Sequence, residues 1–592
     1  MDNKILAYMN LNTAYRPRAI PKSGRFTFLS KVSGMPQVWT LDKDNKPIPY
    51  AEFDDTVIGV YHSPNGDMSV VGKDNNGNEK VQLYLLLKDG QETETLVESP
   101  EHFHDFGGWS PDGKYIAFSS NRRHPGFFDV FIQNVITKEI TKVFENDDIC
   151  SPVTWLPDGE HLLIDIPENS LDQNLFKLNI KTGETIKVGE KDVPARYQSF
   201  TFTKDKQAGY VLTDLNEEMM YISKFSLNNL NSFEKVVHVS EWDIEEFKLF
   251  SNQQKMVYTI NEGGIYKLCI FDLNTQENKE IEGLPKGVID SIAWVSEDEF
   301  VFGVNTPTCP GDIWKYTLSN DQVERLTYIS HSEEVTLTEP KICTYRSFDG
   351  LEVPYFYYEK KQSENKSALL YVHGGPTVQT RAEYNYYIQY LVDQGFAVAA
   401  PNVRGSSGYG RTYMGLDDVR NRMDSVKDLV SLVDDLVKTH KVNPHKVGIM
   451  GRSYGGFMVN AAISHYPDLW GAAASIVGIS SFKTFMNTTG HWRRKLRGSE
   501  YGTIEEDLAF FEEIDPLLHS HKIKAPLLVF HGLNDSRVPV TESIQLVMAM
   551  KERRQDVGLT IFENEGHFTE KIENHIKMHG NIVKFMEKHL LD

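Results

Sequence analysis

The stretch VGIMGRSYGGFMVNAA, residues 447–462, joins two apolar runs through the six residues GRSYGG. The first run predicts the end of a buried strand, and residues 457–463 predict the start of a buried helix. Gly451, Ser453 and Gly455 fit Gly-x-Ser-x-Gly, in which the glycines allow a very tight strand-to-helix turn and the serine is exposed. The stretch therefore predicts a nucleophilic serine. The alternative, a glycine-rich turn with a chance serine, has to be judged from the rest of the chain.

Further along the chain, two residues are candidates for the general base and the orienting acid that such a serine needs. Asp535 lies just past the strand-like run PLLVF, and His567 lies just past the run LTIFE. The order Ser, Asp, His, with each residue on a loop after a strand, is that of a doubly wound hydrolase sheet. We therefore predict Ser453 as nucleophile, Asp535 as acid and His567 as base, in preference to a turn-forming aspartate and a surface histidine.

Acyl transfer also requires hydrogen-bond donors for the oxyanion of the tetrahedral intermediate. The backbone N–H of Tyr454, directly after the serine, is one donor by geometry. HGGP at residues 373–376 follows the strand-like run ALLYV, and its two glycines leave a backbone N–H free to point into the site. For HGGP alone, a tight turn ended by Pro376 is an equally good interpretation.

Up to about residue 335, one turn phrase recurs along the chain. It reads PKSGR at 21, PNGD at 64, PDGK at 111, PDGE at 157, KDKQ at 204, NQQK at 252 and SEDE at 296, with spacings of 43, 47, 46, 47, 48 and 44 residues. A short apolar strand, an aromatic-containing strand and a polar hairpin follow the phrases. Four strands per repeat of this length predict a seven-bladed β-propeller over residues 1–335, which fits the period better than a solenoid or a β-sandwich.

After about residue 336 the pattern changes, because strand-like runs alternate with helical stretches. Apolar residues recur at helical spacing over residues 424–439 and again over 576–590. This alternation predicts a mostly parallel, doubly wound sheet, so residues 336–592 are expected to form an α/β-hydrolase domain.

Composition narrows the function classes. The 83 acidic and 62 basic residues give a net charge of −21, which opposes binding to nucleic acid or an anionic membrane. The four cysteines are far apart and indicate neither a disulfide framework nor a zinc cluster. With no signal peptide and no apolar stretch of about 20 residues, we expect a cytoplasmic protein without a membrane span. Neither a metal nor a cofactor is predicted.

Several residues near these motifs are expected to be structural. Ser406 and Ser407 stand outside the Gly-x-Ser-x-Gly register, and Arg404 is expected in a structural ion pair. His373 and His531 do not follow Asp535 in the chain, which argues against either as the base. His575 and His579 have the spacing of metal ligands on a helix, but without a matched third ligand we expect a solvated helix face.

The motifs HGGP, PNVRGSSGYGR, GRSYGGFM, HGLNDSRVP and NEGH, behind a seven-bladed propeller, resemble the prolyl oligopeptidase family of serine peptidases, and its acylaminoacyl-peptidase branch most of all. The resemblance implies Gly375 as the second oxyanion donor and Arg537 as the residue that binds a substrate carbonyl on the acyl side. The chain departs from the family's pattern at Phe568, because the residue after the corresponding histidine is often glycine in that family. The N-terminal helical extension of some members is missing or very short.

We therefore predict a serine exopeptidase or oligopeptidase that hydrolyses short peptides through an acyl-enzyme, releasing N-terminal acylated or free amino acids, with access limited by the propeller. The alternatives are a carboxylesterase or amidase with the same triad, and an interaction scaffold with a vestigial triad. The oligomeric state, including a homo-oligomer, stays open. We also expect Asp535 to raise the pKa of His567 relative to a free histidine.

Overall fold

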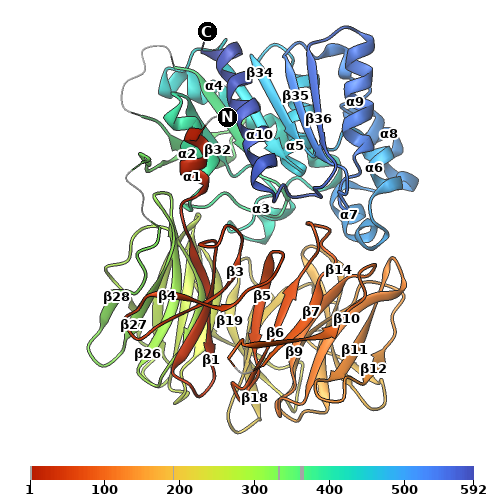
Figure 1. Cartoon of the computed structure of the whole chain (residues 1–592). Coiled ribbons are helices and arrows are strands. Elements are labelled where there is room, and N and C mark those ends of the chain that lie inside the picture. Colours follow the sequence, from red (N-terminus) through yellow and green to blue (C-terminus); the bar gives the residue numbers. More distant parts are fainter. Residues whose placement is uncertain (1–2, 88, 191, 331–333, 361–365, 592) are drawn as a thin grey trace. The chain divides into compact units, whose positions relative to one another are not determined.

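A computed structural model describes residues 3–87, 89–190, 192–330, 334–360 and 366–591 of the 592-residue chain. Contacts between residues divide the chain into two units. One, the hydrolase unit, comprises Met1–Leu11, Asn76–Asn78 and Ser332–Asp592, and the other, the propeller unit, comprises Asn12–Asn75 and Glu79–His331. In Figure 1 the propeller strands run from red to green, and the hydrolase strands run from green to blue, as do the hydrolase helices except α1 (Asn3–Met9), which is red.

The propeller unit contains seven four-stranded antiparallel sheets in chain order, so the prediction of seven blades is confirmed. The first three blades are β1 (Ala14–Ile20), β2 (Arg25–Ser30), β3 (Gln37–Leu41), β4 (Pro47–Ala51); β5 (Val57–His62), β6 (Met68–Lys73), β7 (Gln82–Leu87), β8 (Glu92–Val97); and β9 (His104–Trp109), β10 (Tyr115–His124), β11 (Phe127–Asn134), β12 (Ile140–Phe144).

The remaining blades follow the same order. They are β13 (Ser151–Trp155), β14 (His161–Asn169), β15 (Asp172–Asn179), β16 (Thr185–Lys187); β17 (Tyr197–Phe202), β18 (Ala208–Thr213), β19 (Tyr221–Ser226), β20 (Phe233–Val237); β21 (Asp243–Leu249), β22 (Lys255–Glu262), β23 (Ile265–Asp272), β24 (Asn278–Glu280); and β25 (Val288–Trp294), β26 (Glu299–Thr306), β27 (Cys309–Thr317), β28 (Gln322–Arg325).

The recurring phrase has the same place in every blade, between its first and second strands. The strand that follows is apolar because it is buried; in β10, for example, Ile116 and Phe118 are fully buried. The first and last blades meet through apolar packing, since Phe28 of β2 shares a core cluster with Val301 of β26 and Ile313 of β27. The period of the sequence therefore corresponds to one blade.

The hydrolase unit is built on an eight-stranded sheet of order β29-β30-β32-β31-β33-β34-β35-β36. Its strands are β29 (Lys341–Arg346), β30 (Glu352–Tyr358), β31 (Ala368–Val372), β32 (Ala397–Pro401), β33 (Val447–Arg452), β34 (Ala472–Ile476), β35 (Leu527–Gly532) and β36 (Val557–Phe562). From β32 to β36 the neighbours are parallel, whereas β29 and β30 are antiparallel. The predicted α/β-hydrolase fold is confirmed.

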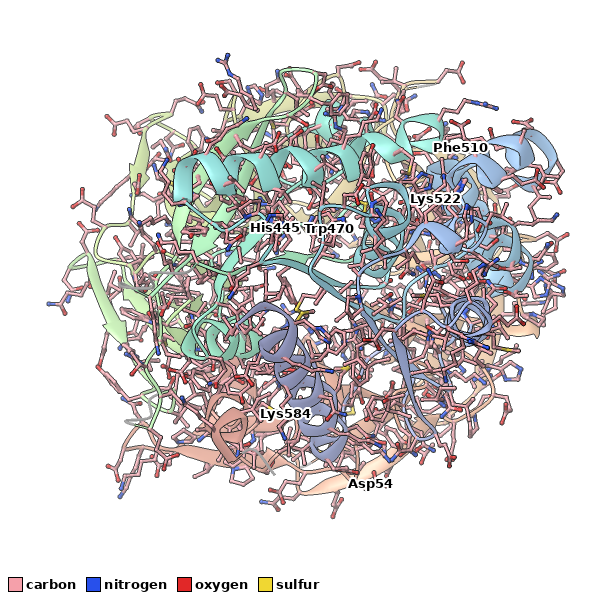
Figure 2. All side chains as sticks on the ribbon, turned by 90° about the horizontal axis from the view of Figure 1, so that it is seen from above. Asp54, His445, Trp470, Phe510, Lys522 and Lys584 are labelled. Carbon is pink, nitrogen blue, oxygen red and sulfur yellow. The ribbon has the colours of Figure 1, made fainter. Side chains whose placement is uncertain are left out.

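Helices follow most of these strands, and α1 precedes them all in the chain. They are α1 (Asn3–Met9), α2 (Tyr386–Asp393), α3 (Arg411–Gly415), α4 (Arg422–His440), α5 (Tyr454–His465), α6 (Phe482–Thr488), α7 (Arg494–Tyr501), α8 (Ile504–Ile514), α9 (Thr541–Glu552) and α10 (Ile572–Leu590), with short 3-10 helices at Val419–Asn421, His491–Arg493 and Ser520–Lys522. Trp470 and Phe510, both labelled in Figure 2, belong to the apolar core. No helix within the described ranges is long and apolar enough to cross a membrane.

The first helix packs on the hydrolase unit. Ile5 and Tyr8 of α1 are buried, and the Tyr8 ring lies 5.8 Å from that of Tyr390 in α2. The Tyr384 hydroxyl donates a hydrogen bond of 2.7 Å to the Tyr8 carbonyl oxygen. These contacts place the described residues before Asn12 with the hydrolase unit, whereas the repeat pattern predicts a propeller over residues 1–335.

Candidate active site

Ser453 lies at the turn between β33 and α5. Its backbone angles, φ 59° and ψ −119°, are rare for a residue with a side chain. The Ser453 N–H donates to the Ile476 carbonyl (2.9 Å), and its own carbonyl accepts from the Phe457 N–H (3.0 Å). The turn therefore holds Ser453 in a strained backbone conformation between the strand and the helix, as the motif predicts.

The glycines of this motif are required by close backbone contacts. A Cβ atom on Gly455 would collide with the carbonyl oxygens of Val372 and His373, at the end of β31. A Cβ atom on Gly451 would collide with the carbonyl of Gly455. Side chains at either position would push α5 away from the sheet and displace Ser453.

Ser453, His567 and Asp535 form one chain of hydrogen bonds. His567 Nε2 lies 3.0 Å from Ser453 Oγ, and His567 Nδ1 lies 2.9 and 2.8 Å from the two carboxylate oxygens of Asp535. In this geometry Nδ1–H donates to the carboxylate, and Nε2 is left to accept the serine proton. The loops that follow β35 and β36 carry the acid and the histidine, so the structure brings the three predicted residues together.

The Asp535 carboxylate is held by several donors. Its side chain is fully buried, and Oδ1 accepts hydrogen bonds from the backbone N–H groups of Arg537 (2.8 Å) and Val538 (2.9 Å). Burial raises its pKa, but hydrogen bonds from His531 and His567 outweigh burial and hold the pKa well below its ordinary value. The acid therefore stays ionised at neutral pH and can stabilise a charged imidazole.

The pKa of His567 differs from the expectation. Burial lowers it, and the hydrogen bond and charge of Asp535 offset this only in part. The cations of Arg452 and Arg537 lower it further. The net pKa lies below the ordinary value of 6.5, so the expected upward shift is wrong: the His567 side chain is 3% exposed, and its burial dominates.

The two residues expected to donate to an oxyanion lie on segments that border Ser453. Tyr454 is the first residue of α5, where backbone N–H groups have no partner within the helix. In the HGGP segment, a Cβ atom on Gly374 would lie 3.7 Å from the Ser453 Cβ, so the segment passes beside the serine. Gly375 has a φ of +129°, which favours glycine.

Two arginine side chains lie over the ring of Phe568. The Cζ atoms of Arg452 and Arg537 lie 5.0 and 5.1 Å from the centre of its ring, within cation–π range. Arg452 Nη2 also donates to the His567 carbonyl oxygen (2.7 Å) and so ties the serine turn to the histidine loop. Sequence reasoning missed Arg452, although it lies inside GRSYGG, because nothing in that motif reveals a contact with residues over 110 positions away.

Other expectations for nearby residues are met in the structure. Arg404 forms ion pairs with Asp428 and Asp349, both 2.8 Å. The Ser406 hydroxyl donates to the Val403 carbonyl (2.6 Å) and lies 2.9 Å from His373 Nε2. Ser406 and His373 therefore stabilise the loop after β32, which agrees with a structural role for both.

His531 lies beside the Asp535 loop, near the candidate site, as the sequence predicts. Its Nε2 is 2.8 Å from the Val538 carbonyl oxygen and 3.4 Å from Asp535 Oδ2, and its Nδ1 is 2.7 Å from Ser543 Oγ. It therefore braces the Asp535 loop, which agrees with a structural role.

The expectation of a solvated face at His575 and His579 is wrong for His579. This residue is 6% exposed, and its Nε2 lies 2.8 Å from the Tyr386 hydroxyl. The Tyr386 hydroxyl also lies 2.9 Å from His575 Nδ1. Helical spacing alone could not reveal that α2 covers this face of α10.

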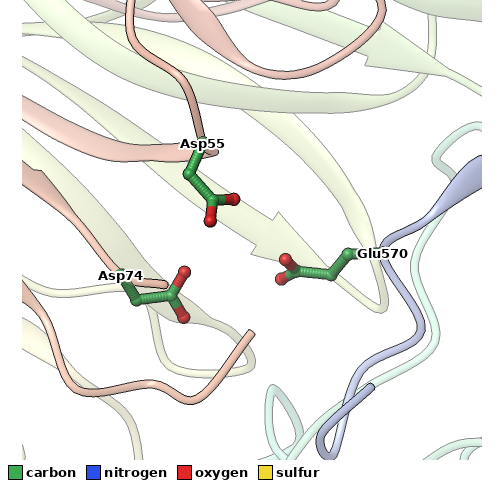
Figure 3. A group of neighbouring side chains, drawn as sticks. All are labelled: Asp55, Asp74 and Glu570. Atoms are coloured by element: carbon green, nitrogen blue, oxygen red, sulfur yellow. The ribbon is translucent and has the colours of Figure 1, made fainter. Parts of the chain in front are cut away.

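Figure 3 shows three carboxylates outside the candidate site. Asp55 and Asp74 belong to the propeller unit, where Asp74 follows β6 and accepts a hydrogen bond from the Glu79 N–H (2.9 Å). Glu570 belongs to the hydrolase unit, and its N–H donates to Glu565 (3.0 Å). Because the acids come from different units, we assign them no ligand, and the absence of a metal stays a prediction from the sequence.

Comparisons with known proteins agree with this fold. The profile of the Prolyl oligopeptidase family matches residues 382–592. Dipeptidyl aminopeptidase BIII of Pseudoxanthomonas mexicana is 33% identical over 211 residues, which are 35% of this chain and 31% of that protein. Acylamino-acid-releasing enzyme 1 of Oryza sativa subsp. japonica is 26% identical over 254 residues, which are 41% of this chain and 33% of that protein. The chain thus spans about a third of the length of these two relatives.

A solved structure extends the similarity in fold to the whole chain. The acylaminoacyl peptidase of Pyrococcus horikoshii superposes with a TM-score of 0.77 and covers 99% of this chain and 97% of its own, at 18% sequence identity. At this identity the match concerns the two-domain architecture.

Proposed function

Because the chain belongs, through its C-terminal domain, to the prolyl oligopeptidase family of serine peptidases, we propose that it hydrolyses short peptides through an acyl-enzyme formed on Ser453. The observation that carries the proposal is the hydrogen-bonded chain from Ser453 through His567 to Asp535, at a strained strand-to-helix turn. A serine hydroxyl is a weak nucleophile unless a base of this kind accepts its proton.

In the proposed mechanism, Ser453 Oγ attacks the scissile carbonyl carbon as its proton passes to His567 Nε2. The N–H groups of Tyr454 and Gly375 stabilise the oxyanion. When the C–N bond breaks, His567 returns the proton to the leaving amine, and the acyl group remains on Ser453. Water then attacks the ester, giving its proton to His567, which passes it back to Ser453 as the acid product leaves.

We propose that the substrates are short peptides from which an acylated or free N-terminal amino acid is released. The similarity to proteins named acylamino-acid-releasing enzyme and dipeptidyl aminopeptidase supports this class. Arg537, which the family resemblance implies as the residue that binds a substrate carbonyl on the acyl side, lies on the same loop as Asp535, and its guanidinium is a charged hydrogen-bond donor suited to that role. We also propose that large substrates have limited access to Ser453.

The test labels the full-length protein with a fluorophosphonate and then offers it a substrate panel. The panel contains acetyl-aminoacyl and free aminoacyl p-nitroanilides, p-nitrophenyl acetate, and one peptide sequence presented both free and inside a stable folded domain. We expect label on Ser453, cleavage of anilides and of the free peptide, and an intact folded domain. Label on another residue would refute the nucleophile, and hydrolysis of the acetate alone would favour an esterase.

Arg537→Ala is expected to lower kcat/KM by about one to two orders of magnitude for acyl-aminoacyl anilides, because a charge-assisted hydrogen bond contributes roughly 1.5–3 kcal/mol. The loss should be small for p-nitrophenyl acetate, which has no carbonyl for Arg537 to bind. Parallel assays of both substrates check this, with the exposed Arg553→Ala as a matched control. Equal losses on the two substrates would contradict carbonyl binding by Arg537.

The kcat/KM should rise with pH through the titration of His567, because only the neutral imidazole can accept the serine proton. Since the His567 pKa is lowered, the midpoint should lie below 6.5, with activity lost under it and constant above it. A pH profile from 4.5 to 8.5 measures this midpoint. Arg452→Met removes a cation that lowers this pKa, so its midpoint should move to higher pH, whereas Arg553→Met should not change it. A wild-type midpoint above 6.5 would contradict the lowered pKa of His567, and a kcat/KM that falls as the pH rises from 4.5 to 7 would exclude a histidine base.

A further inference from the structure

One of the two proposed oxyanion donors belongs to a loop glycine. Tyr454 is fixed by α5, but Gly375 lies in the loop after β31 and is a glycine with a φ of +129°. Glycine has the widest range of backbone conformations of any residue. A group that anchors the Gly375 carbonyl would therefore help to fix the direction of its N–H.

Arg497 provides such a contact. It lies on α7, and its Nη1 is 3.5 Å from the carbonyl oxygen of Gly375, a long hydrogen bond. The same nitrogen pairs with the Glu500 carboxylate at 2.6 Å, one turn further along α7. The Glu500 side chain is 3% exposed and that of Arg497 13%, so water screens this ion pair weakly. Glu500 thus fixes the guanidinium that faces the Gly375 carbonyl.

A second set of contacts connects Glu500 to Tyr454, the residue that carries the other donor. The Glu500 carbonyl oxygen accepts a hydrogen bond from Arg422 Nη2 (2.6 Å), and Arg422 pairs with Asp417. Asp417 in turn accepts a hydrogen bond from the Tyr454 hydroxyl (2.7 Å). Both residues that carry the oxyanion donors are therefore attached to one network, which consists of Arg497, Glu500, Arg422 and Asp417.

We propose that Arg497, held by Glu500, is a positioning residue that orients the Gly375 N–H toward the oxyanion. This rests on the proposed function, since it assumes acyl transfer at Ser453. Anchoring the Gly375 carbonyl restricts rotation of the residue, so the N–H is aimed before the oxyanion forms, which is how such donors stabilise charge. Arg497 itself touches neither the substrate nor the reacting atoms in this role.

The test measures how fast a fluorophosphonate labels Ser453 in the full-length protein, which requires no identified substrate. Ser453 Oγ bonds to phosphorus, fluoride leaves, and the serine proton passes to His567, while charge develops on the phosphoryl oxygen. Arg497→Met should slow labelling by about 10–100-fold, less than the roughly 10²–10³-fold lost when one donor is removed entirely. Glu500→Gln should slow labelling in the same direction, and Arg497→Lys should retain more activity than Arg497→Met.

Arg494→Met is the matched control. Arg494 lies on the same helix but donates to the carbonyls of Thr489 and Asn487, so its labelling rate should stay within about twofold of wild type. On an acyl-aminoacyl anilide, Arg497→Met should lower kcat and leave KM and the pH midpoint unchanged, because oxyanion stabilisation acts in the transition state. A structural disturbance of the site would move KM and the midpoint as well.

The outcomes separate this proposal from the function on which it rests. If wild type is not labelled at Ser453, the proposed function is wrong. If wild type is labelled, but Arg497→Met and Glu500→Gln are labelled equally fast, the positioning role of Arg497 is wrong. An equal loss in Arg494→Met would also overturn that role, because it would show that α7 responds to any lost charge.

Discussion

Replacing Ser453 with alanine is expected to lower kcat/KM by about 10³-fold or more on every substrate of the enzyme. The change removes only Oγ, the atom 3.0 Å from His567 Nε2, and leaves the tight turn and its backbone hydrogen bonds in place. The melting temperature should therefore stay close to that of wild type. Steady-state kinetics and a thermal melt of the purified variant measure both quantities.

Ser407→Ala is the matched control for this variant. Ser407 also lies in a glycine-rich loop, but outside the serine motif, so its replacement should leave kcat/KM within a few fold of wild type. If Ser453→Ala retained a tenth of the wild-type turnover, Ser453 could not be the nucleophile.

Asp535→Asn is expected to lower kcat by about 10⁴-fold, the loss seen when a triad aspartate is replaced by its amide. The asparagine amide can donate to His567 Nδ1, which favours the imidazole tautomer with its proton on Nε2. That nitrogen then cannot accept the proton of Ser453, although the residues keep their positions. The measurement is kcat on a good anilide substrate, normalised to the folded protein.

Asp515→Asn controls for the loss of a buried, hydrogen-bonded carboxylate. Asp515 is 3% exposed and accepts hydrogen bonds from the N–H groups of Leu517 and Leu518. Its replacement should lower stability but change kcat per folded molecule by only a few fold. A loss under tenfold in Asp535→Asn would show that Asp535 does not select the His567 tautomer.

Local patterns in the sequence were sufficient to predict the fold and to predict that three residues of the candidate site lie together. Seven turn phrases at a constant period predict seven blades, because each phrase connects the first two strands of one sheet. Gly-x-Ser-x-Gly predicts the turn at Ser453, because only glycines tolerate the backbone contacts found there. The order of Asp535 and His567 after successive strands places them at one edge of a parallel sheet, where the structure has them.

Contacts between distant segments could not be predicted in this way. His567 has a lowered pKa because burial and the cations of Arg452 and Arg537 outweigh Asp535. These groups come from the end of β33, the loop after β35 and the loop after β36. His579 is buried because α2 covers it.

By itself, therefore, the sequence determined the blades, the serine turn, and the positions of Asp535 and His567 after successive strands, because periodicity and turn chemistry act over a few neighbouring residues. Only the tertiary structure decided the pKa of His567, the contacts of Phe568 with two arginines and the contact of Arg497 with Gly375. Desolvation and charge proximity depend on which segments meet in space, and residues 122 positions apart carry no local signal of that meeting.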